Sequence, residues 1–218
     1  MKTFAVILCG SGFKDGSEIR ESVAVLWALD SFHVKFQCFA PDAPQHEVVN
    51  CLTGESTTES RNQLVEAARI ARGQVKPLNT LHAKDFAGLI LPGGFGAAKN
   101  LCDFAYKEAD GSVTPQLQSV LVDFHHSGKP IGAVCIAPAI LALAFKGEKL
   151  ELTVGQISET SEIIEKLGHT HVPTRVTECL VDVKNKIVTT PAYMDDKARL
   201  SDLFEGVRKL VGNVIELS

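Results

Sequence analysis

The strongest constraint on the fold is a regular alternation of short, continuous apolar runs with longer stretches in which apolar residues recur at helical spacing. Each apolar run ends at Gly, Pro or a turn, which is typical of strands buried on both faces of a sheet. The predicted strands are residues 4–8, 34–39, 89–91 and 131–134. The predicted helices are residues 18–29, 61–71, 113–126 and, near the end of the chain, about 195–211.

This alternation predicts a doubly wound α/β fold, in which helices cover both faces of a mostly parallel sheet and the crossovers are right-handed. Residues 177–183 and 187–190 flank Lys184-Asn185-Lys186, so we expect a C-terminal hairpin to extend the sheet. No repeat, low-complexity segment or linker interrupts the 218 residues, and 45% of them are hydrophobic. A single domain over residues 1–218 is therefore expected.

The charge pattern and the start of the chain exclude two classes of partner. The formal net charge is -4, and no segment concentrates Lys and Arg with interleaved aromatic residues as a nucleic-acid groove requires. The first apolar run is too short to span a membrane, and no signal-peptidase site follows it. We expect no nucleic acid and no membrane as partners, and a cytoplasmic protein.

The six cysteines are Cys9, Cys38, Cys51, Cys102, Cys135 and Cys179. In a cytoplasmic protein they are expected to be reduced thiols, and no Cys-x-x-Cys pair indicates a metal site. After the first strand, Gly10 and Gly12 resemble the start of a dinucleotide fingerprint, but Lys14 and Asp15 stand where its third glycine belongs. We therefore expect neither a metal nor a nucleotide cofactor.

Cys135 is the strongest candidate for a reactive residue. Ligands of open α/β sheets bind at the carboxyl ends of the strands, and Cys135 follows the strand 131–134 directly. Ala137-Pro138 begins a helix just behind it, so the thiol occupies the position of a nucleophile elbow. The helix start is expected to lower the thiol pKa. The backbone amides of Ile136 and Gly94 are expected to bind an oxyanion that forms when Cys135 attacks a carbonyl. An inert core thiol is the alternative.

Glu18 is the candidate acid–base group. It begins the helix that follows the first strand, at the same edge of the sheet as Cys135. The alternative for Glu18 is an exposed carboxylate that only stabilises the helix start. Ile136 stands where a Cys-His peptidase would place its histidine, so peptidase chemistry is weakly supported. His171, which alternates with His169 along a possible strand, and Cys9, at the end of the first strand, are further candidates for the substrate pocket, together with Gly93.

Five runs of the sequence, given at the end of this paragraph, resemble a known family. The chain is similar to the bacterial isoprenoid-biosynthesis glyoxalases, also called enhancing lycopene biosynthesis or sigma cross-reacting proteins. They belong to the class I glutamine-amidotransferase-like superfamily, with the Parkinsonism-associated deglycase and PfpI-type proteases. The resemblance covers essentially the whole chain and rests on these runs: Asp15-Gly16-Ser17-Glu18-Ile19, Leu52-Thr53-Gly54-Glu55, residues 91–101, Cys135-Ile136-Ala137-Pro138-Ala139 and residues 189–194.

The resemblance implies a flavodoxin-like sheet, a nucleophilic Cys135, and a carboxylate at Glu18 that contacts it. It also implies a homodimer, a link to isoprenoid biosynthesis, and conversion of 2-oxoaldehydes such as methylglyoxal and glyoxal to 2-hydroxy acids without a cofactor. In that reaction Cys135 adds to the aldehyde, and Glu18 moves a proton through an enediol to give a thioester that water hydrolyses. Three alternatives stay open: a redox sensor that uses the same cysteine, a non-catalytic stress-response protein, and a cysteine-dependent deglycase or amidase.

Overall fold

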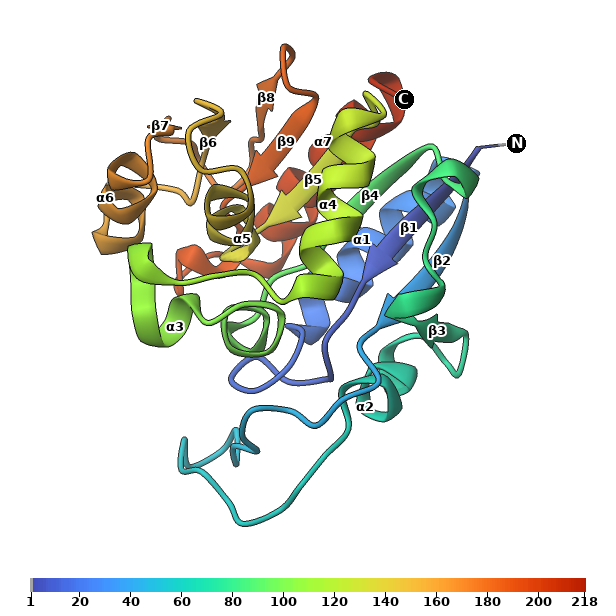
Figure 1. Ribbon diagram of the computed structural model, residues 1–218, viewed down its shortest axis with the longest axis vertical. Coiled ribbons are helices and arrows are strands. Elements are labelled where there is room, and N and C mark those ends of the chain that lie inside the picture. The colour runs from blue at the N-terminus through green and yellow to red at the C-terminus, as the bar shows by residue number, and fades with distance from the viewer. Residues whose placement is uncertain (1) are drawn as a thin grey trace.

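The computed structural model describes residues 2–218 and shows a central sheet between two layers of helices (Figure 1). The strands are β1 (Thr3–Ile7), β2 (Lys35–Ala40), β3 (Val75–Pro77), β4 (Gly88–Leu91), β5 (Ile131–Val134), β6 (Glu151–Leu152), β7 (Thr170–His171), β8 (Leu180–Asp182) and β9 (Ile187–Thr190). The α-helices are α1 (Ile19–Ser31), α2 (Gln63–Ile70), α3 (Phe104–Lys107), α4 (Pro115–His126), α5 (Ala137–Ala144), α6 (Glu159–Lys166) and α7 (Leu200–Glu216).

The main sheet has seven strands in the order β3-β2-β1-β4-β5-β9-β8, and every neighbouring pair is parallel except β8 and β9. The mostly parallel α/β fold and the C-terminal hairpin predicted from the sequence are confirmed. The strand order reverses direction between β1 and β4, and ligands of such sheets bind beside this switch point. The carboxyl ends of β1, β4 and β5 therefore form the edge where a site is expected.

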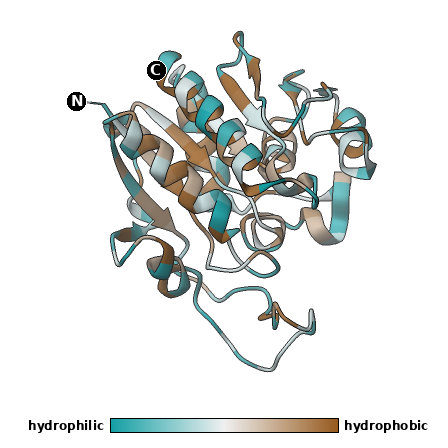
Figure 2. Cartoon of the chain, turned by 180° about the vertical axis from the view of Figure 1, so that it is seen from behind, coloured by the Kyte–Doolittle hydropathy of each residue, from teal (hydrophilic) through white to brown (hydrophobic). Residues whose placement is uncertain are grey.

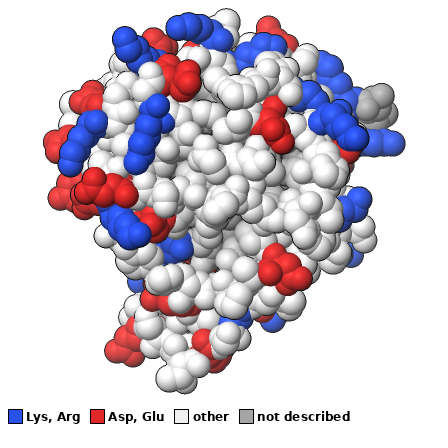
Figure 3. All heavy atoms as spheres, viewed as in Figure 1, with Lys and Arg blue, Asp and Glu red and all other residues white. Residues whose placement is uncertain are grey.

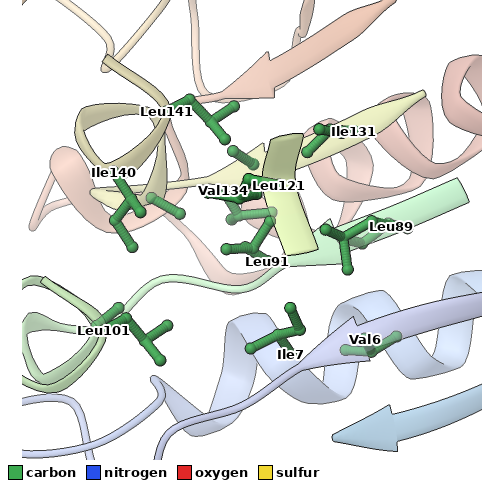
Figure 4. Packing of buried hydrophobic residues seen from close by; sticks show 14 of the residues in the cluster. Val6, Ile7, Leu89, Leu91, Leu101, Leu121, Ile131, Val134, Ile140 and Leu141 are labelled. Atoms are coloured by element: carbon green, nitrogen blue, oxygen red, sulfur yellow. The ribbon is translucent and has the colours of Figure 1, made fainter. Parts of the chain in front are cut away.

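Helices α1, α4 and α7 each bury one apolar face against the sheet, and α5 is buried on all sides. In Figure 1, α4 and α5 lie in front of the sheet and α1 and α7 behind it; Figure 2 shows this second pair from its own side, with apolar strands beneath. Leu121 of α4 and Ile140 of α5 lie beside Leu91 and Val134 of the strands (Figure 4). Burying a side chain of this size contributes about 1.5–3 kcal/mol. This packing holds the strand ends, and the turns that follow them, in place.

The structure differs from the predicted elements where the sequence signal is weak. A second sheet, formed by β6 and β7, has strands of two residues, which are too short to show a periodic pattern. Helix α6 is polar and begins with a capping box between Ser158 and Ser161. The last helix begins at Leu200, later than predicted, because a single 3₁₀ turn at Ala192–Met194 and an irregular segment precede it.

The surface shown in Figure 3 carries acidic and basic side chains around its margin, and neither sign gathers into one patch there. Within residues 2–218, none of the helices combines the length and the apolar character needed to cross a bilayer.

Candidate active site

Cys135 lies on a tight turn between β5 and α5. Its φ is 62°, a left-handed conformation that is uncommon for a residue other than glycine. The Cys135 amide donates to the carbonyl oxygen of Thr190, at the end of β9, over 2.9 Å. The strand-end position expected for Cys135 is therefore observed, and its backbone is strained. Cys135 lines one cavity together with Phe13 of the loop after β1 and Phe95 of the loop after β4.

Glu21, on the first turn of α1, is the carboxylic acid beside the Cys135 thiol. Its side chain is fully buried beside the thiol, and the two groups shift each other's pKa. Oε2 accepts from the Gly93 amide at 3.1 Å, and Oε1 accepts from the Tyr193 amide at 3.2 Å. Helix α1, the loop at Gly93 and the turn at Tyr193 are distant in the sequence, and together they position the Glu21 carboxyl group.

Gly93 allows Glu21 and Cys135 to approach one another. A Cβ atom at position 93 would lie 2.5 Å from the Cys135 Cβ and 2.7 Å from Glu21 Oε2, both far inside van der Waals contact. Any side chain there would separate the thiol from the carboxyl group. Gly93 does not line the cavity described below, so its assignment to the substrate pocket is wrong. Its role is to leave room behind the thiol and the carboxyl group.

The two groups of this pair have unusual acidities. Burial raises the pKa of Glu21 to about 8, and the nearby Glu18 carboxyl adds to the rise. Burial also raises the pKa of Cys135 well above its ordinary value, as does the neighbouring Glu21 carboxyl group, while the amides of Gly94 and Ile136 act in the opposite direction. The prediction of a lowered thiol pKa is wrong, because desolvation and a neighbouring carboxylate outweigh the helix start.

The amides of Gly94 and Ile136 lie close enough to the Cys135 sulfur to act on the pKa of the thiol, so the structure brings the predicted oxyanion donors to it. Gly94 has a φ of +101°, and a Cβ there would lie 2.4 Å from the Glu18 nitrogen. This close approach lets Glu18 donate its own amide to the Gly93 carbonyl at 3.0 Å. The loops after β1 and β4 are thereby packed together beneath the sulfur.

Glu18 is the N-cap residue of α1, and its carboxylate accepts from the Glu21 amide at 2.6 Å. It is half-buried, and burial raises its pKa. The expectation that Glu18 contacts Cys135 is wrong: Glu21, one helical turn further on, makes that contact. The overlooked signal is helical spacing, because Glu21 lies on the same face of α1 as the buried Ala24, Val25 and Ala28. A carboxyl group on an apolar face requires a buried partner.

A cavity of about 710 Å³ opens onto Cys135. Phe13, Ile19, Phe95, Ile136 and Met194 give most of its apolar wall. Its polar side chains include Glu18, Arg20, Tyr193 and Asp196, and Arg20 donates to the Tyr193 hydroxyl at 2.9 Å. The remaining lining residues are Gly12, Cys51, Cys135 and Thr160. The cavity is large and mainly apolar, with the thiol in its wall.

Cys9 and His171 do not line this cavity, so their assignment to the substrate pocket is wrong. Cys9 is fully buried under the loop that follows β1, where its thiol lies 3.6 Å from the Ser17 hydroxyl, and burial raises its pKa to about 12. His171 is buried in β7 of the small sheet, and burial lowers its pKa. His169 is structural: its ring contacts the Ala142 carbonyl at 3.0 Å and accepts from the Leu150 amide.

No histidine is among the residues that line the cavity in residues 2–218, and no group of three or more His, Cys, Asp or Glu side chains in that range is arranged to hold a metal. The groups that act on the Cys135 thiol most directly are one buried carboxyl group and two backbone amides, and Glu18, Arg20 and Tyr193 line the same cavity. The thiol and these groups can form a covalent bond with a carbonyl carbon, stabilise the resulting oxyanion and move protons.

Comparison with curated proteins shows a similarity over nearly the whole chain. The human mitochondrial protein named glutamine amidotransferase-like class 1 domain-containing protein 3 is 44% identical over 224 aligned residues, which cover 98% of this chain and 82% of the human protein. The chain belongs to the glutamine amidotransferase-like class 1 (ES1) family. Another relative is the rat mitochondrial ES1 protein homolog, 43% identical over 98% of this chain and 83% of its own length. No family model matches the chain.

A solved structure supports the same family assignment. An isoprenoid biosynthesis protein with an amidotransferase-like domain from Ehrlichia chaffeensis is 37% identical, with a TM-score of 0.92 over 100% of this chain and 99% of that one. The resemblance to the isoprenoid-biosynthesis and amidotransferase-like proteins is thereby confirmed. Drosophila melanogaster DJ-1beta, 19% identical with a TM-score of 0.55 over 99% of this chain and 95% of its own, shares the fold.

The predicted cytoplasmic location is contradicted by these comparisons. The human and rat members of the ES1 family, and the zebrafish ES1 protein that is 29% identical, are all named mitochondrial proteins. The prediction was drawn from the first apolar run of the sequence, whereas targeting signals are read by the targeting machinery independently of the fold.

Proposed function

We propose that this ES1-family protein is a glyoxalase that converts 2-oxoaldehydes such as methylglyoxal and glyoxal to 2-hydroxy acids through Cys135. The observation that supports it most is the placement of one thiol between a buried carboxyl group and two converging backbone amides, in the wall of an apolar cavity. The protein's own thiol takes the place of an external one, so the reaction requires no glutathione. Glu21, rather than Glu18, is the acid–base group of this proposal.

The first step forms a hemithioacetal. Glu21 in its ionised form accepts the thiol proton as the Cys135 sulfur bonds to the aldehyde carbon. The aldehyde oxygen becomes an alkoxide, which the amides of Gly94 and Ile136 stabilise. Glu21 then gives the proton to this oxygen and is ionised again. A carboxyl group with a pKa of about 8 suits both directions of transfer near neutral pH.

The next steps move hydrogen between the two carbons of the substrate. Glu21 removes the proton from the carbon that carries the sulfur, which gives an enediolate. A proton shifts between the two oxygens, and Glu21 returns its proton to the former ketone carbon. The product is a thioester of Cys135 with a 2-hydroxy acid. Water cleaves it, restores the thiol and releases the acid, so the whole reaction consumes one water molecule and needs no external oxidant or reductant.

The competing functions are less well supported by the site. A thiol whose pKa is raised carries little thiolate at neutral pH, which disfavours a redox sensor, since oxidation follows thiolate character. Cysteine peptidases use a histidine to protonate the leaving nitrogen, and the cavity-lining residues within 2–218 include no histidine. A place in isoprenoid biosynthesis, a mitochondrial location and a homodimer are further proposals, of which the first two follow the names of relatives.

The proposal is tested by the formation of lactate from methylglyoxal by purified protein, without glutathione. Cys135→Ala should abolish turnover, while Cys38→Ala, which removes a buried thiol outside the cavity, should keep it. Lactate formation by Cys135→Ala at the wild-type rate would refute the mechanism. An inactive wild-type protein that is folded would refute the proposed activity.

A further inference from the structure

The cavity beside Cys135 is larger and more apolar than methylglyoxal requires. We propose that the preferred substrates are 2-oxoaldehydes with a bulky, uncharged apolar substituent, such as a branched alkyl group, and that Phe13 and Phe95 determine this specificity. The inference rests on the proposed glyoxalase activity and names the substrate class of the same site.

The size of the cavity is the first argument. Its volume of about 710 Å³ lies within the range of roughly 300–1,000 Å³ that holds drug-sized ligands. Methylglyoxal carries only a methyl group beyond its two reacting carbonyls, so it leaves most of this space to water. A substrate that fills the cavity needs a substituent several carbon atoms long.

The exposed side chains around the cavity are the second argument. Phe13, Ile19 and Phe95 are 47%, 46% and 50% exposed, and all three line this one cavity. Large apolar side chains gathered at one concave site indicate a binding surface, because a bound apolar group would remove them from water. An apolar substituent on the substrate would cover these side chains while its carbonyl groups face Cys135.

The two phenylalanines are held in place before any ligand arrives. The Phe95 amide donates to the Phe13 carbonyl at 2.7 Å, which joins the loop after β4 to the loop after β1. The ammonium group of Lys99 lies 4.5 Å from the centre of the Phe95 ring, and that of Lys14 lies 5.5 Å from the Phe13 ring. Lys99 is itself fixed by the Lys14 carbonyl and the Glu47 carboxylate. A preorganised wall of this kind loses little entropy on binding.

The charges at the cavity favour an uncharged substituent. Arg20 is the cation among the lining residues, and it already donates to the Tyr193 hydroxyl and interacts with the charge of Glu18. Asp196 adds a carboxylate on the same wall. An anionic substituent would be repelled by two acidic side chains and would compete for an engaged arginine.

The test compares two substrates with the same reacting group: methylglyoxal and 4-methyl-2-oxopentanal, whose substituent is isobutyl instead of methyl. We expect the wild-type kcat/KM for 4-methyl-2-oxopentanal to be at least roughly tenfold higher, since one methylene group in an apolar pocket changes kcat/KM by about 10-fold to 200-fold. Equal or lower kcat/KM for the longer substrate would overturn the inference. Activity with methylglyoxal that depends on Cys135 would in that case leave the proposed function intact.

Variants test which residues are responsible. Phe95→Ala and Phe13→Ala should each reduce the ratio of the two kcat/KM values by roughly fivefold or more, because they remove the wall that the isobutyl group covers. Tyr106→Ala is the matched control, since this aromatic residue is also 50% exposed but lies outside the cavity, and its ratio should equal that of the wild type. A ratio that is the same in all variants would remove Phe13 and Phe95 as specificity residues. No turnover of either substrate by folded wild-type protein would refute the inference together with the proposed function.

Discussion

Replacing Glu21 by glutamine separates the acidity of this carboxyl group from its shape. In the native protein both Glu21 oxygens accept from backbone amides, those of Gly93 and Tyr193. Glutamine has one oxygen, so one of these buried amides loses its partner, at a cost of about 1–3 kcal/mol. That cost is independent of pH. The cost of ionising Glu21 in a buried position depends on pH and is absent from the variant.

The sign of the pH effect follows from the raised pKa. The folded protein holds the Glu21 proton up to about pH 8, whereas the unfolded chain releases it near the ordinary value of 4.5. Stability from this group is therefore fully present below about pH 4.5 and is lost as pH rises toward 8. The slope is about 1.4 kcal/mol per pH unit within this window, so the free energy of unfolding should fall by roughly 2–3 kcal/mol between pH 5 and pH 7 through this one group.

Urea unfolding at pH 5, 6, 7 and 8 measures the effect. The Glu21→Gln protein should be less stable than the wild type at pH 5 and at least as stable at pH 8, so the two curves of unfolding free energy cross. Glu162→Gln, at an exposed position of α6, should retain the wild-type slope. If Glu21→Gln keeps the wild-type slope, the carboxyl group titrates normally in the folded protein, and its assignment as an acid–base group near neutral pH is refuted.

Four further predictions concern the same site. Wild-type kcat/KM for methylglyoxal should rise with pH and level off near 8, the pKa of Glu21, and a rate that is flat from pH 6 to 9 would contradict a Glu21 base. Glu21→Gln should lower kcat by roughly a hundredfold or more, whereas Glu18→Gln, which keeps an oxygen for the Glu21 amide, should lower it by less than about tenfold; the reverse order would return Glu18 to the catalytic role. Gly93→Ala should lower the unfolding free energy by about 1–3 kcal/mol in thermal or urea unfolding, because its Cβ would lie 2.5 Å from the Cys135 Cβ; an unchanged stability would show that the close approach is absent. Cys51, which is exposed, should react with a maleimide well before the buried Cys38 when peptides are analysed by mass spectrometry, and simultaneous labelling would contradict the described burial.

Much of the fold was predictable because its strands are buried on both faces. Continuous apolar runs and helical periodicity placed β1, β2, β4 and β5 and the helices between them, and the Lys184-Asn185-Lys186 turn placed the hairpin. The small sheet of β6 and β7 was not predicted, because two-residue strands are held by tertiary neighbours and carry no pattern of their own.

The site was predictable in part, because one of its features depends on neighbouring residues in the chain and the other depends on tertiary packing. The position of Cys135 between a strand and a helix start is a local property, and the sequence is enough to recognise it. The partner of Cys135 depends on which residue of α1 faces the end of β5. Glu18 and Glu21 lie one helical turn apart. Glu21 is on the apolar face of α1, and this position in the sequence favours it as the buried partner of Cys135.

The sequence by itself determined the alternation of the long buried strands with helices, the elbow at Cys135 and the glycine turn at Gly93-Gly94, because each depends on residues close together in the chain. Only the tertiary structure decided the acidity of the site. Burial of Glu21 and Cys135, not the nearby helix start, sets the direction of both pKa shifts. Desolvation depends on everything packed around a group, and here that surrounding is made by α1, β4, β5 and the turn at Tyr193, which come together only in the folded chain.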